Sequence, residues 1–509
     1  MSRRVLVRID AAGEVHGFAL DGGESGDAQV VVADLDGEVR VFGPGLSLDQ
    51  LPSRITPFDG SSLDQAGPRC RLELQVLDLW GLADHVDPQE VKVAVYWWPE
   101  GEALSQAHEI FRGVVRDPEF DLALDGDGAQ AGSVSFTIAA DTRSPDRPFP
   151  PTAIGDQGRF PAAPSSSAQY AVPVIYGTVR GVPLYPISST SGDPVKLLVA
   201  GHQIRSAAVQ LGFEGNAGPV AGIKYDIDGR GHLYAYCEVS QAFWAASGDG
   251  LYAVSVQGWA APDGSAIDRL GDVLLHVWNT YGGERFYELD RRRTHGCRDR
   301  LNRYRVGLLV NDVQSGGTVL RLLAGRIQPQ FPIVFGFAGW RFGWDMTVPV
   351  RREGGQPAAH LIYGENCHDR RGPRPTSVDD IVTEFELAYA SDGYAGGTVS
   401  SARRSAENDG ACRAALSRWG ASPVQRIEAP DIVDDGTAWT YLSDLVWWRT
   451  RRHDRVEYTC DDPDLFDLPN GEEVVVTDAV AGWDRRSFFI EALAPTPDGR
   501  VTLVLVGAK

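Results

Sequence analysis

The sequence predicts a mainly β protein with smaller α/β modules, divided into several domains. The chain has 509 residues, too many for one core, because domains are typically about 100–150 residues long. It contains 57 Gly and 31 Pro without a collagen-like period, a composition typical of many short strands joined by tight turns. Apolar residues recur at every second position along much of the chain, and at helical spacing in only a few segments.

Residues 1–145 are predicted to form antiparallel strands. The dipeptide Asp36-Gly37 lies between the valine-rich runs 30–32 and 39–41, and Asp-Gly in that position is a strong signal for a β-hairpin. Apolar residues alternate again at 72–76, 91–95, 120–124 and 134–138. So many short alternating strands indicate a barrel or a sandwich.

Residues 146–190 are predicted to be a proline-rich connector. Prolines cluster around its start, at Pro145, Pro148, Pro150, Pro151, Pro161 and Pro164. Because proline has no amide donor and restricts the backbone, we expect a linker or a surface arm here, with a domain boundary at its start.

The remaining chain is predicted to mix helices with strands. Residues 191–350 form a mixed α/β module with a helix over 267–281 and a short apolar segment at 319–323. Residues 351–425 form a connecting segment that contains a strand over 383–389 and a helix ended by Gly420. Residues 426–509 begin with a helix over 437–452, after Asp434 and Asp435. Strands follow at 473–476, 488–493 and 501–506, with a turn at Asp498-Gly499 before the last.

The charge balance argues against a nucleic-acid-binding protein. The chain carries 48 Lys and Arg against 69 Asp and Glu, a net charge of −21. Nucleic-acid binding needs basic surfaces that displace the counterions of the phosphates, and only 291–293 and 449–452 form obvious basic clusters. An acidic surface suits a conduit through which DNA slides, although it also simply keeps a protein soluble.

The six cysteines are expected to be reduced and mostly buried. They form no CxxC pair and lie far apart, at Cys70, Cys237, Cys297, Cys367, Cys412 and Cys460, which fits neither a zinc ribbon nor a dense disulfide framework. No signal peptide is expected, because Asp10 interrupts the apolar start of the chain. No membrane segment is expected either, because no apolar stretch approaches the length of a spanning helix.

No catalytic, cofactor-binding or metal-binding residue is predicted, and the protein is expected not to be an enzyme. Cys367-His368 is a poor nucleophile–base pair, because adjacent side chains rarely point at each other. His360 and His368 lack the intervening glutamate of a zinc motif. Asp226 and Asp228 resemble the start of a calcium loop, but Arg230 and His232 occupy the next ligand positions, so a hairpin turn is favoured.

The tryptophans are candidates for a binding surface or an interface. Exposed tryptophans stack on sugars or anchor interfaces, whereas buried ones belong to a core. The sequence leaves open which applies to Trp97, Trp98, Trp340, Trp344, Trp447 and Trp448. Since Trp447 and Trp448 are adjacent on a predicted helix, we expect one of them to meet another domain or chain.

Four segments, taken in order, carry a resemblance to a known family. They are Ile-Phe-Arg-Gly-Val-Val at 110–115 with its return at 136–141, the proline-bearing arm at 159–183, the mixed part with 267–281 and 319–323, and the end at 412–506. In this order the chain resembles the tail hub or tail tip proteins of long-tailed bacteriophages, prophages and gene transfer agents. One departure is Glu472, where the family usually has aspartate.

The resemblance implies a structural tail tip hub in the virion, assembled in the host bacterial cytoplasm. Such hubs have two tube-like β-barrel domains, here expected at 1–145 and 426–509, with smaller α/β domains inserted between them. A homotrimer supplies six barrels, which joins the six-fold tail tube to the three-fold tip and continues the DNA channel. The implied partners are a tail tube or distal tail protein, the tape measure protein, and a spike or fibre protein. DNA passes through the lumen without specific binding.

Two other functions compete with this interpretation. A carbohydrate- or receptor-binding tail protein would present its tryptophans on a concave surface. A peptidoglycan-cleaving tail enzyme would need paired carboxylates or a metal site in a groove, and no such constellation is found in the sequence. Binding to host polysaccharide and clearing of cell-wall substrate separate these two functions from a hub.

Overall fold

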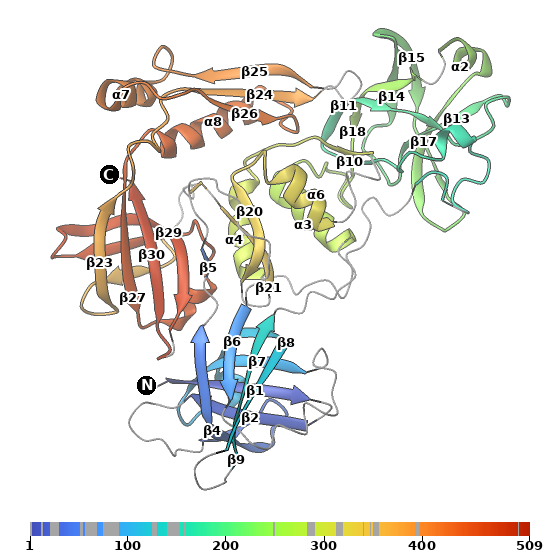
Figure 1. Ribbon diagram of the computed structural model, residues 1–509. Helices are drawn as coiled ribbons and strands as arrows, with labels where there is room; N and C mark the ends of the chain where they lie inside the picture. The colour runs from blue at the N-terminus through green and yellow to red at the C-terminus, as the bar shows by residue number, and fades with distance from the viewer. Residues whose placement is uncertain are drawn as a thin grey trace.

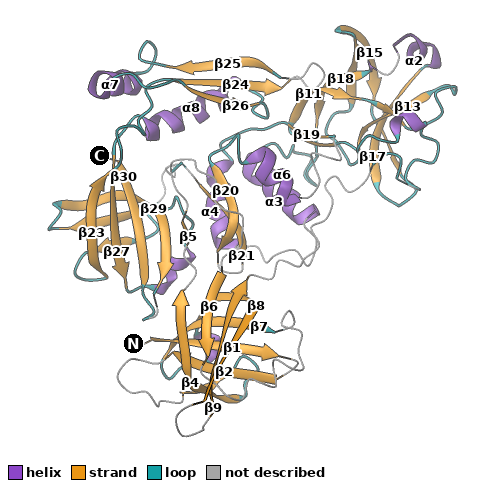
Figure 2. Ribbon diagram, viewed as in Figure 1, coloured by secondary structure: helices purple, strands orange, loops and turns teal. Residues whose placement is uncertain are grey.

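The computed structural model confirms a mainly β fold with α/β parts (Figure 2). It describes residues 3–11, 14–20, 30–50, 54–55, 69–74, 91–124, 130–139, 153–156, 158–247, 250–281, 291–311, 319–338, 341–346, 348–349, 356–391, 397–496 and 498–508.

The N-terminal strands form a closed barrel (Figure 1). Its strands are β1 (Arg3–Ala11), β2 (Glu14–Leu20), β4 (Val39–Gln50), β6 (Arg69–Leu74), β7 (Lys92–Pro99), β8 (His108–Leu124) and β9 (Gln130–Ala139). They follow the order β2-β1-β7-β8-β9-β6-β4, and a parallel pairing of β4 with β2 closes the ring. Strand β3 (Val30–Ala33) pairs with the first part of β4. The hairpin predicted at Asp36-Gly37 is confirmed, with Gly37 at a positive φ of 84°.

The chain next forms a small β sandwich. One sheet has the order β11-β18-β14-β15 and the other β12-β13-β17-β16, and both contribute to one apolar cluster. The strands are β11 (Thr178–Pro183), β12 (Tyr185–Pro186), β13 (Val195–Ala200), β14 (Ala208–Phe213), β15 (Asn216–Gly222), β16 (Lys224–Ile227), β17 (Leu233–Val239) and β18 (Tyr252–Gln257), with the short helix α2 (Gln241–Ser247). The first part of the predicted mixed module is therefore almost entirely β.

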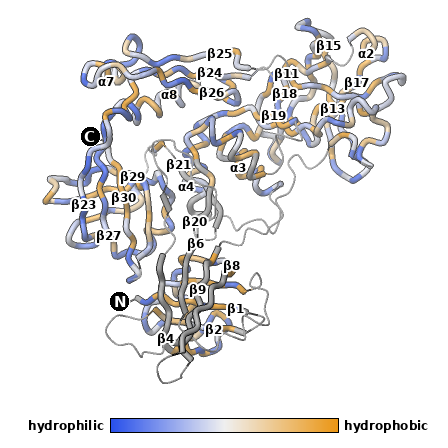
Figure 3. Tube along the Cα trace, in the orientation of Figure 1, coloured by the Kyte–Doolittle hydropathy of each residue, from blue (hydrophilic) through white to orange (hydrophobic). Residues whose placement is uncertain are grey.

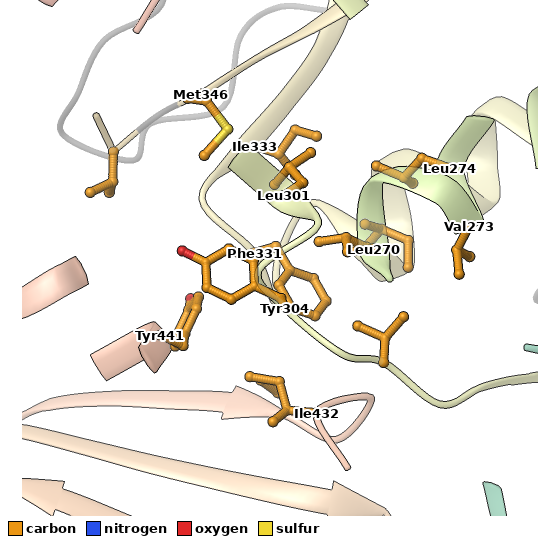
Figure 4. Packing of buried hydrophobic residues seen from close by; sticks show 14 of the residues in the cluster. Leu270, Val273, Leu274, Leu301, Tyr304, Phe331, Ile333, Met346, Ile432 and Tyr441 are labelled. Carbon is orange, nitrogen blue, oxygen red and sulfur yellow. The ribbon is translucent and has the colours of Figure 1, made fainter. Parts of the chain in front are cut away.

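The centre of the molecule is helical. It contains α3 (Leu270–Tyr281), α4 (Arg291–Leu301), α6 (Val319–Leu322), the π-helical turn η6 (Leu323–Ile327), the pair β10 (Val174–Tyr176) and β19 (Leu308–Val310), and the hairpin β20 (Ile333–Ala338) and β21 (Arg341–Met346). Tyr304, Phe331 and Tyr441 pack together in its core (Figure 4). The helix predicted from 267 begins at Leu270, because Ile267 and Arg269 pair their backbones with Gly177 and Arg305.

A three-stranded α/β module follows, with strand order β25-β24-β26. Its elements are β24 (Phe385–Ser391), β25 (Thr398–Arg404), α7 (Gly410–Trp419), β26 (Gln425–Ala429) and α8 (Asp435–Arg449). The predicted cap residues are confirmed. Gly420 ends α7 at a φ of 85°, and the Asp434 carboxylate accepts a hydrogen bond from the amide of Thr437 at the start of α8.

The C-terminal sheet is curved and has the order β22-β28-β29-β30-β27-β23. Its strands are β22 (His360–Ile362), β23 (Cys367–Pro375), β27 (His453–Cys460), β28 (Glu473–Asp478), β29 (Trp483–Pro495) and β30 (Val501–Ala508). The turn predicted at Asp498-Gly499 is confirmed by the backbone bond from Thr496 N to Arg500 O, 2.9 Å. Figure 3 shows that β30 is mostly hydrophobic, whereas β23 and β27 are mostly hydrophilic. Strands β22 and β23 come from within the predicted connecting segment 351–425.

Candidate assembly site

The N-terminal barrel and the C-terminal sheet share one apolar core. Trp97 of β7 is 1% exposed, and its ring meets Phe466 edge-on with 5.9 Å between centroids. The Trp97 indole nitrogen Nε1 donates a hydrogen bond to the carbonyl oxygen of Thr496, at 3.0 Å. The two β domains are therefore held together by a buried aromatic residue whose polar atom is also satisfied.

A backbone pairing adds to this contact. Strand β5 (Arg54–Ile55), which lies in the sequence between two strands of the N-terminal barrel, pairs antiparallel with β29 of the C-terminal sheet. His108 of β8 also faces Asp467, with 3.6 Å between Nε2 and Oδ1. The barrel and the sheet thus join through apolar packing, a short strand pairing and a polar contact, although the sandwich, the helical centre and the α/β module separate them in sequence.

A buried ion pair ties the helical centre to the C-terminal sheet. Arg300 of α4 and Glu472 approach to 2.5 Å, and their side chains are only 2% and 3% exposed. Arg300 Nη1 also donates to the carbonyl oxygen of Gly471, at 2.6 Å. At position 472 the tail hub proteins that the sequence resembles usually have aspartate. In this chain the Glu472 carboxylate is the buried partner of Arg300.

A polar cavity of about 600 Å³ lies where the sandwich, the helical centre and the α/β module meet. Its wall contains Asp431, which accepts hydrogen bonds from Arg326 Nη2 at 2.8 Å and from Gln330 Nε2 at 2.9 Å. Arg326 Nη1 also donates to the carbonyl oxygen of Leu309, at 2.5 Å. These groups satisfy one another's hydrogen-bonding capacity and tie the α/β module to the helical centre beside the sandwich.

Cys367 and His368 do not form a nucleophile–base pair. Cys367 is buried opposite Cys460 on β27, while the His368 ring lies 2.9 Å from the Asp461 carboxylate on the exposed side. A hydrogen bond with Cys367, together with burial, raises the pKa of the Cys460 thiol. The five cysteines whose side chains are described are buried free thiols, as expected, namely Cys237, Cys297, Cys367, Cys412 and Cys460. The side chain of Cys70 lies outside the described residues.

The two aspartates of the calcium-like loop point to different partners. Asp228 is buried and forms an ion pair with Arg159, and it accepts backbone hydrogen bonds from Arg230 and His232. Asp226 is exposed, and β16 pairs with β17 on either side of the turn. The favoured hairpin turn is therefore what the structure contains. Within the described ranges, no group of three or more His, Cys, Asp and Glu side chains is arranged to hold a metal ion. His360 contacts Thr477 at 2.9 Å.

The described tryptophans of the candidate set lie in cores. Trp97, Trp98, Trp344 and Trp448 are buried, and Trp340 lies outside the described residues. Trp447 is half-buried, and the rings of Trp447 and Trp448 lie 5.8 and 5.6 Å from that of Phe489. The premise that neighbouring tryptophans cannot share one core is wrong, because the end of α8 runs over β29 and both rings pack against Phe489 in the same cluster. Both therefore contact the C-terminal sheet. These tryptophans do not form an exposed stacking platform for a sugar.

Sequence reasoning missed the residues that connect the modules. Arg300 lies in helix α4, which begins with Arg291, Arg292 and Arg293. The sequence therefore indicated a basic cluster here and not a buried ion pair. Asp431 and Arg326 lie 105 positions apart, and no local pattern pairs them. The one available signal was Glu472, because the tail hub proteins that the sequence resembles usually have aspartate at this position.

No protein-family model matches the chain, and no curated protein matches its sequence. Among solved structures, the chain is similar to the prophage tail protein gp18 from Listeria monocytogenes EGD-e, with a TM-score of 0.35, 9% sequence identity and 94% of each chain covered. It is also similar to a chain of a lidless PdpA-VgrG complex, with a TM-score of 0.23 and 6% identity, covering 100% of this chain and 65% of the other. Both TM-scores are too low to assign a fold family or a function. Within the described residues, no helix has the length and apolar character needed to cross a membrane.

Proposed function

We propose that this protein is a structural hub at the tip of a bacteriophage tail, without catalytic activity. The observation that carries the proposal is the shared core of the N-terminal barrel and the C-terminal sheet, with the other modules inserted between them in sequence. The order of sequence segments that resembles tail hub proteins supports the same role.

Three copies of the chain form a ring in this proposal. Each copy contributes the N-terminal barrel and the C-terminal sheet, so a homotrimer presents six β domains to a six-fold tube and keeps three-fold symmetry toward the tip. The rigid joint at Trp97 keeps the two β domains of one copy in a fixed relation, which a ring of alternating domains requires.

The proposed partners lie above, within and below the ring. They are a tail tube or distal tail protein, the tape measure protein, and a spike or fibre protein. The net charge of −21 supports a channel that DNA passes without specific binding, because like charge repels the phosphate backbone.

The mass of the purified full chain in solution tests the ring. Light scattering after size exclusion should give a species of three times the 55.2 kDa chain mass, alone or when mixed with neighbouring tail proteins. A chain that stays monomeric in every such mixture contradicts the proposal. Clearing of a cell-wall substrate by the same preparation contradicts its non-catalytic part.

A further inference from the structure

The C-terminal sheet carries a concave basic pocket of about 370 Å³ on its outer side. It lies where β23 and β27 meet the end of α8, and we refer to it as the arginine pocket. Its wall contains four arginines, Arg374, Arg449, Arg451 and Arg455, and two acidic residues, Asp380 and Glu491. Such a concentration of arginine stands out in a chain whose net charge is −21.

Two of these arginines oppose each other directly. Arg374 of β23 and Arg455 of β27 are cross-strand partners in the register of the sheet, and like charges in that position destabilise a sheet. The register shifts between Arg371 and Arg374 through a bulge at Gly372, whose φ is 98°. Bulges re-aim side chains and are common beside functional sites. This bulge places Arg374 at the pocket.

The positive charge of the pocket is only partly balanced within the chain. Arg455 forms an ion pair with Glu491 at 2.6 Å. Arg374 and Arg451 are exposed, and among the described residues neither guanidinium group has an ion pair or a hydrogen-bond partner. Two guanidinium groups thus remain available to a ligand, and their paired donors match a carboxylate.

The floor of the pocket is rigid. The His453 ring stacks on Trp448 with 3.8 Å between centroids, and His453 Nε2 lies 2.9 Å from the carbonyl oxygen of Trp448. The amide of Thr376 donates to the carbonyl oxygen of His453, and the amide of His453 donates to the hydroxyl of Thr376. A rigid floor reduces the entropy lost when a ligand binds.

At this edge of the C-terminal sheet, a partner is recognised by side chains rather than by backbone groups. Strand β23 is the last strand of its sheet, and an open edge normally invites strand addition. Pro373 and Pro375 remove two amide donors here, which is a common protection of an edge strand. A partner therefore meets guanidinium groups at this point and few backbone donors.

We propose that the arginine pocket binds a short acidic segment of a partner protein, with adjacent carboxylates seated between Arg374 and Arg451. A short acidic segment fits better than nucleic acid. A nucleic-acid strand extends beyond a pocket of about 370 Å³, whereas a few adjacent carboxylates need only the pocket. This inference does not depend on the hub proposal.

The test is a binding measurement on the full chain with a fluorescent hexaglutamate peptide, beside a single-stranded DNA oligonucleotide of the same charge. We expect peptide binding that weakens with salt. The Arg374→Ala, Arg451→Ala double variant should bind at least about tenfold more weakly. The matched control is Arg371→Ala on the same strand, since Arg371 pairs with Glu457 at 3.3 Å and lies outside the pocket. This control should bind as the unaltered chain does.

A charge-swapped variant, Arg374→Glu with Arg451→Glu, keeps the test independent of folding defects. It should lose hexaglutamate binding and keep the circular dichroism spectrum and thermal unfolding temperature of the unaltered chain, which separates a loss of the pocket from a loss of the fold. The proposal is overturned if the unaltered chain does not bind hexaglutamate, or if the double alanine variant binds it unchanged. Tighter binding of the DNA oligonucleotide overturns it in favour of a nucleic-acid site.

Discussion

In the N-terminal barrel, β7 buries both of its faces, whereas in the C-terminal sheet β27 buries only one over residues 455–460. Val95 and Trp97 of β7 point into the shared core, and Tyr96 and Trp98 point into a second cluster beneath the β3–β4 hairpin. On β27, Val456, Tyr458 and Cys460 enter the shared core. The outward face of β27 carries charged residues, among them Arg455 and Glu457.

This difference separates two uses of a strand. A strand buried on both faces contributes apolar packing and rigidity and has no side chains left for a partner. A strand buried on one face keeps a charged surface that recognition can use. The barrel strand therefore supplies the joint between the β domains, and the C-terminal sheet supplies the arginine pocket.

Removing the joint should have the largest effect. Trp97→Ala deletes a fully buried ring and its hydrogen bond to Thr496, so we expect a loss of about 5 kcal/mol in the free energy of unfolding. In urea, the N-terminal barrel should then unfold at a lower denaturant concentration than the C-terminal sheet, in two transitions instead of one. Trp98→Ala is the matched control, since Trp98 lies in the second cluster. It should destabilise the barrel and leave the joint intact. Equal uncoupling by both variants would refute the special role of Trp97.

Breaking the buried ion pair between Arg300 and Glu472 should have the second largest effect on stability. Glu472→Ala leaves Arg300 charged and buried, which should cost about 4 kcal/mol in the free energy of unfolding. Arg371→Ala, which breaks the exposed pair with Glu457, should cost less than about 1 kcal/mol. Chemical denaturation of the two variants makes the comparison. A loss below about 1 kcal/mol for Glu472→Ala would show that the ion pair does not fasten the C-terminal sheet to the helical centre.

The C-terminal sheet should also respond to pH through His453. Burial lowers the pKa of His453 to about 4, whereas an unfolded histidine titrates near about 6.5. The neutral ring therefore stabilises the sheet fully above pH 6.5, and about 2–3 kcal/mol of that stability is lost as the pH falls to 4. His453→Phe keeps the stack on Trp448 and should remove this slope, as measured by unfolding at several pH values. An identical slope in both proteins would contradict the prediction.

Changes on the exposed face of the β3–β4 hairpin should have the smallest effect. Val31 and Val41 are cross-strand partners that are 63% and 51% exposed, and Val39 is 70% exposed. Replacing each with threonine should change the free energy of unfolding by less than about 0.5 kcal/mol. Thermal unfolding of the three variants tests this. A larger loss in solution would mean that this face is covered in the isolated chain.

Elements with strong local signals were predictable from the sequence. Asp36-Gly37 and Asp498-Gly499 correctly predicted turns between strands, and Asp434 and Gly420 correctly predicted helix ends. These predictions succeed because a turn or a helix cap depends on only a few adjacent residues. The alternation at 91–95 predicted a strand but not the burial of both faces of β7. The hairpin that covers its other face comes from elsewhere in the sequence.

Other elements gave misleading local signals. Helix α4 buries Thr294, Cys297 and Leu301, but threonine and cysteine do not read as an apolar stripe, and its start looked like a basic cluster. Strand β23 contains Gly372, Pro373 and Pro375, residue types that are depleted in strands. Only its pairing with β27 makes it a strand, and only that pairing brings Arg374 beside Arg455. The arginine pocket was therefore visible in the sequence only as the cluster at 449–452.

Electron cryomicroscopy of an intact tailed particle that contains this chain tests the hub role most directly. The proposed role predicts three copies at the end of the tail tube, with the N-terminal barrel and C-terminal sheet of each copy alternating around the channel. Density that places the chain outside the channel wall, or in a copy number that three-fold symmetry does not allow, would contradict it.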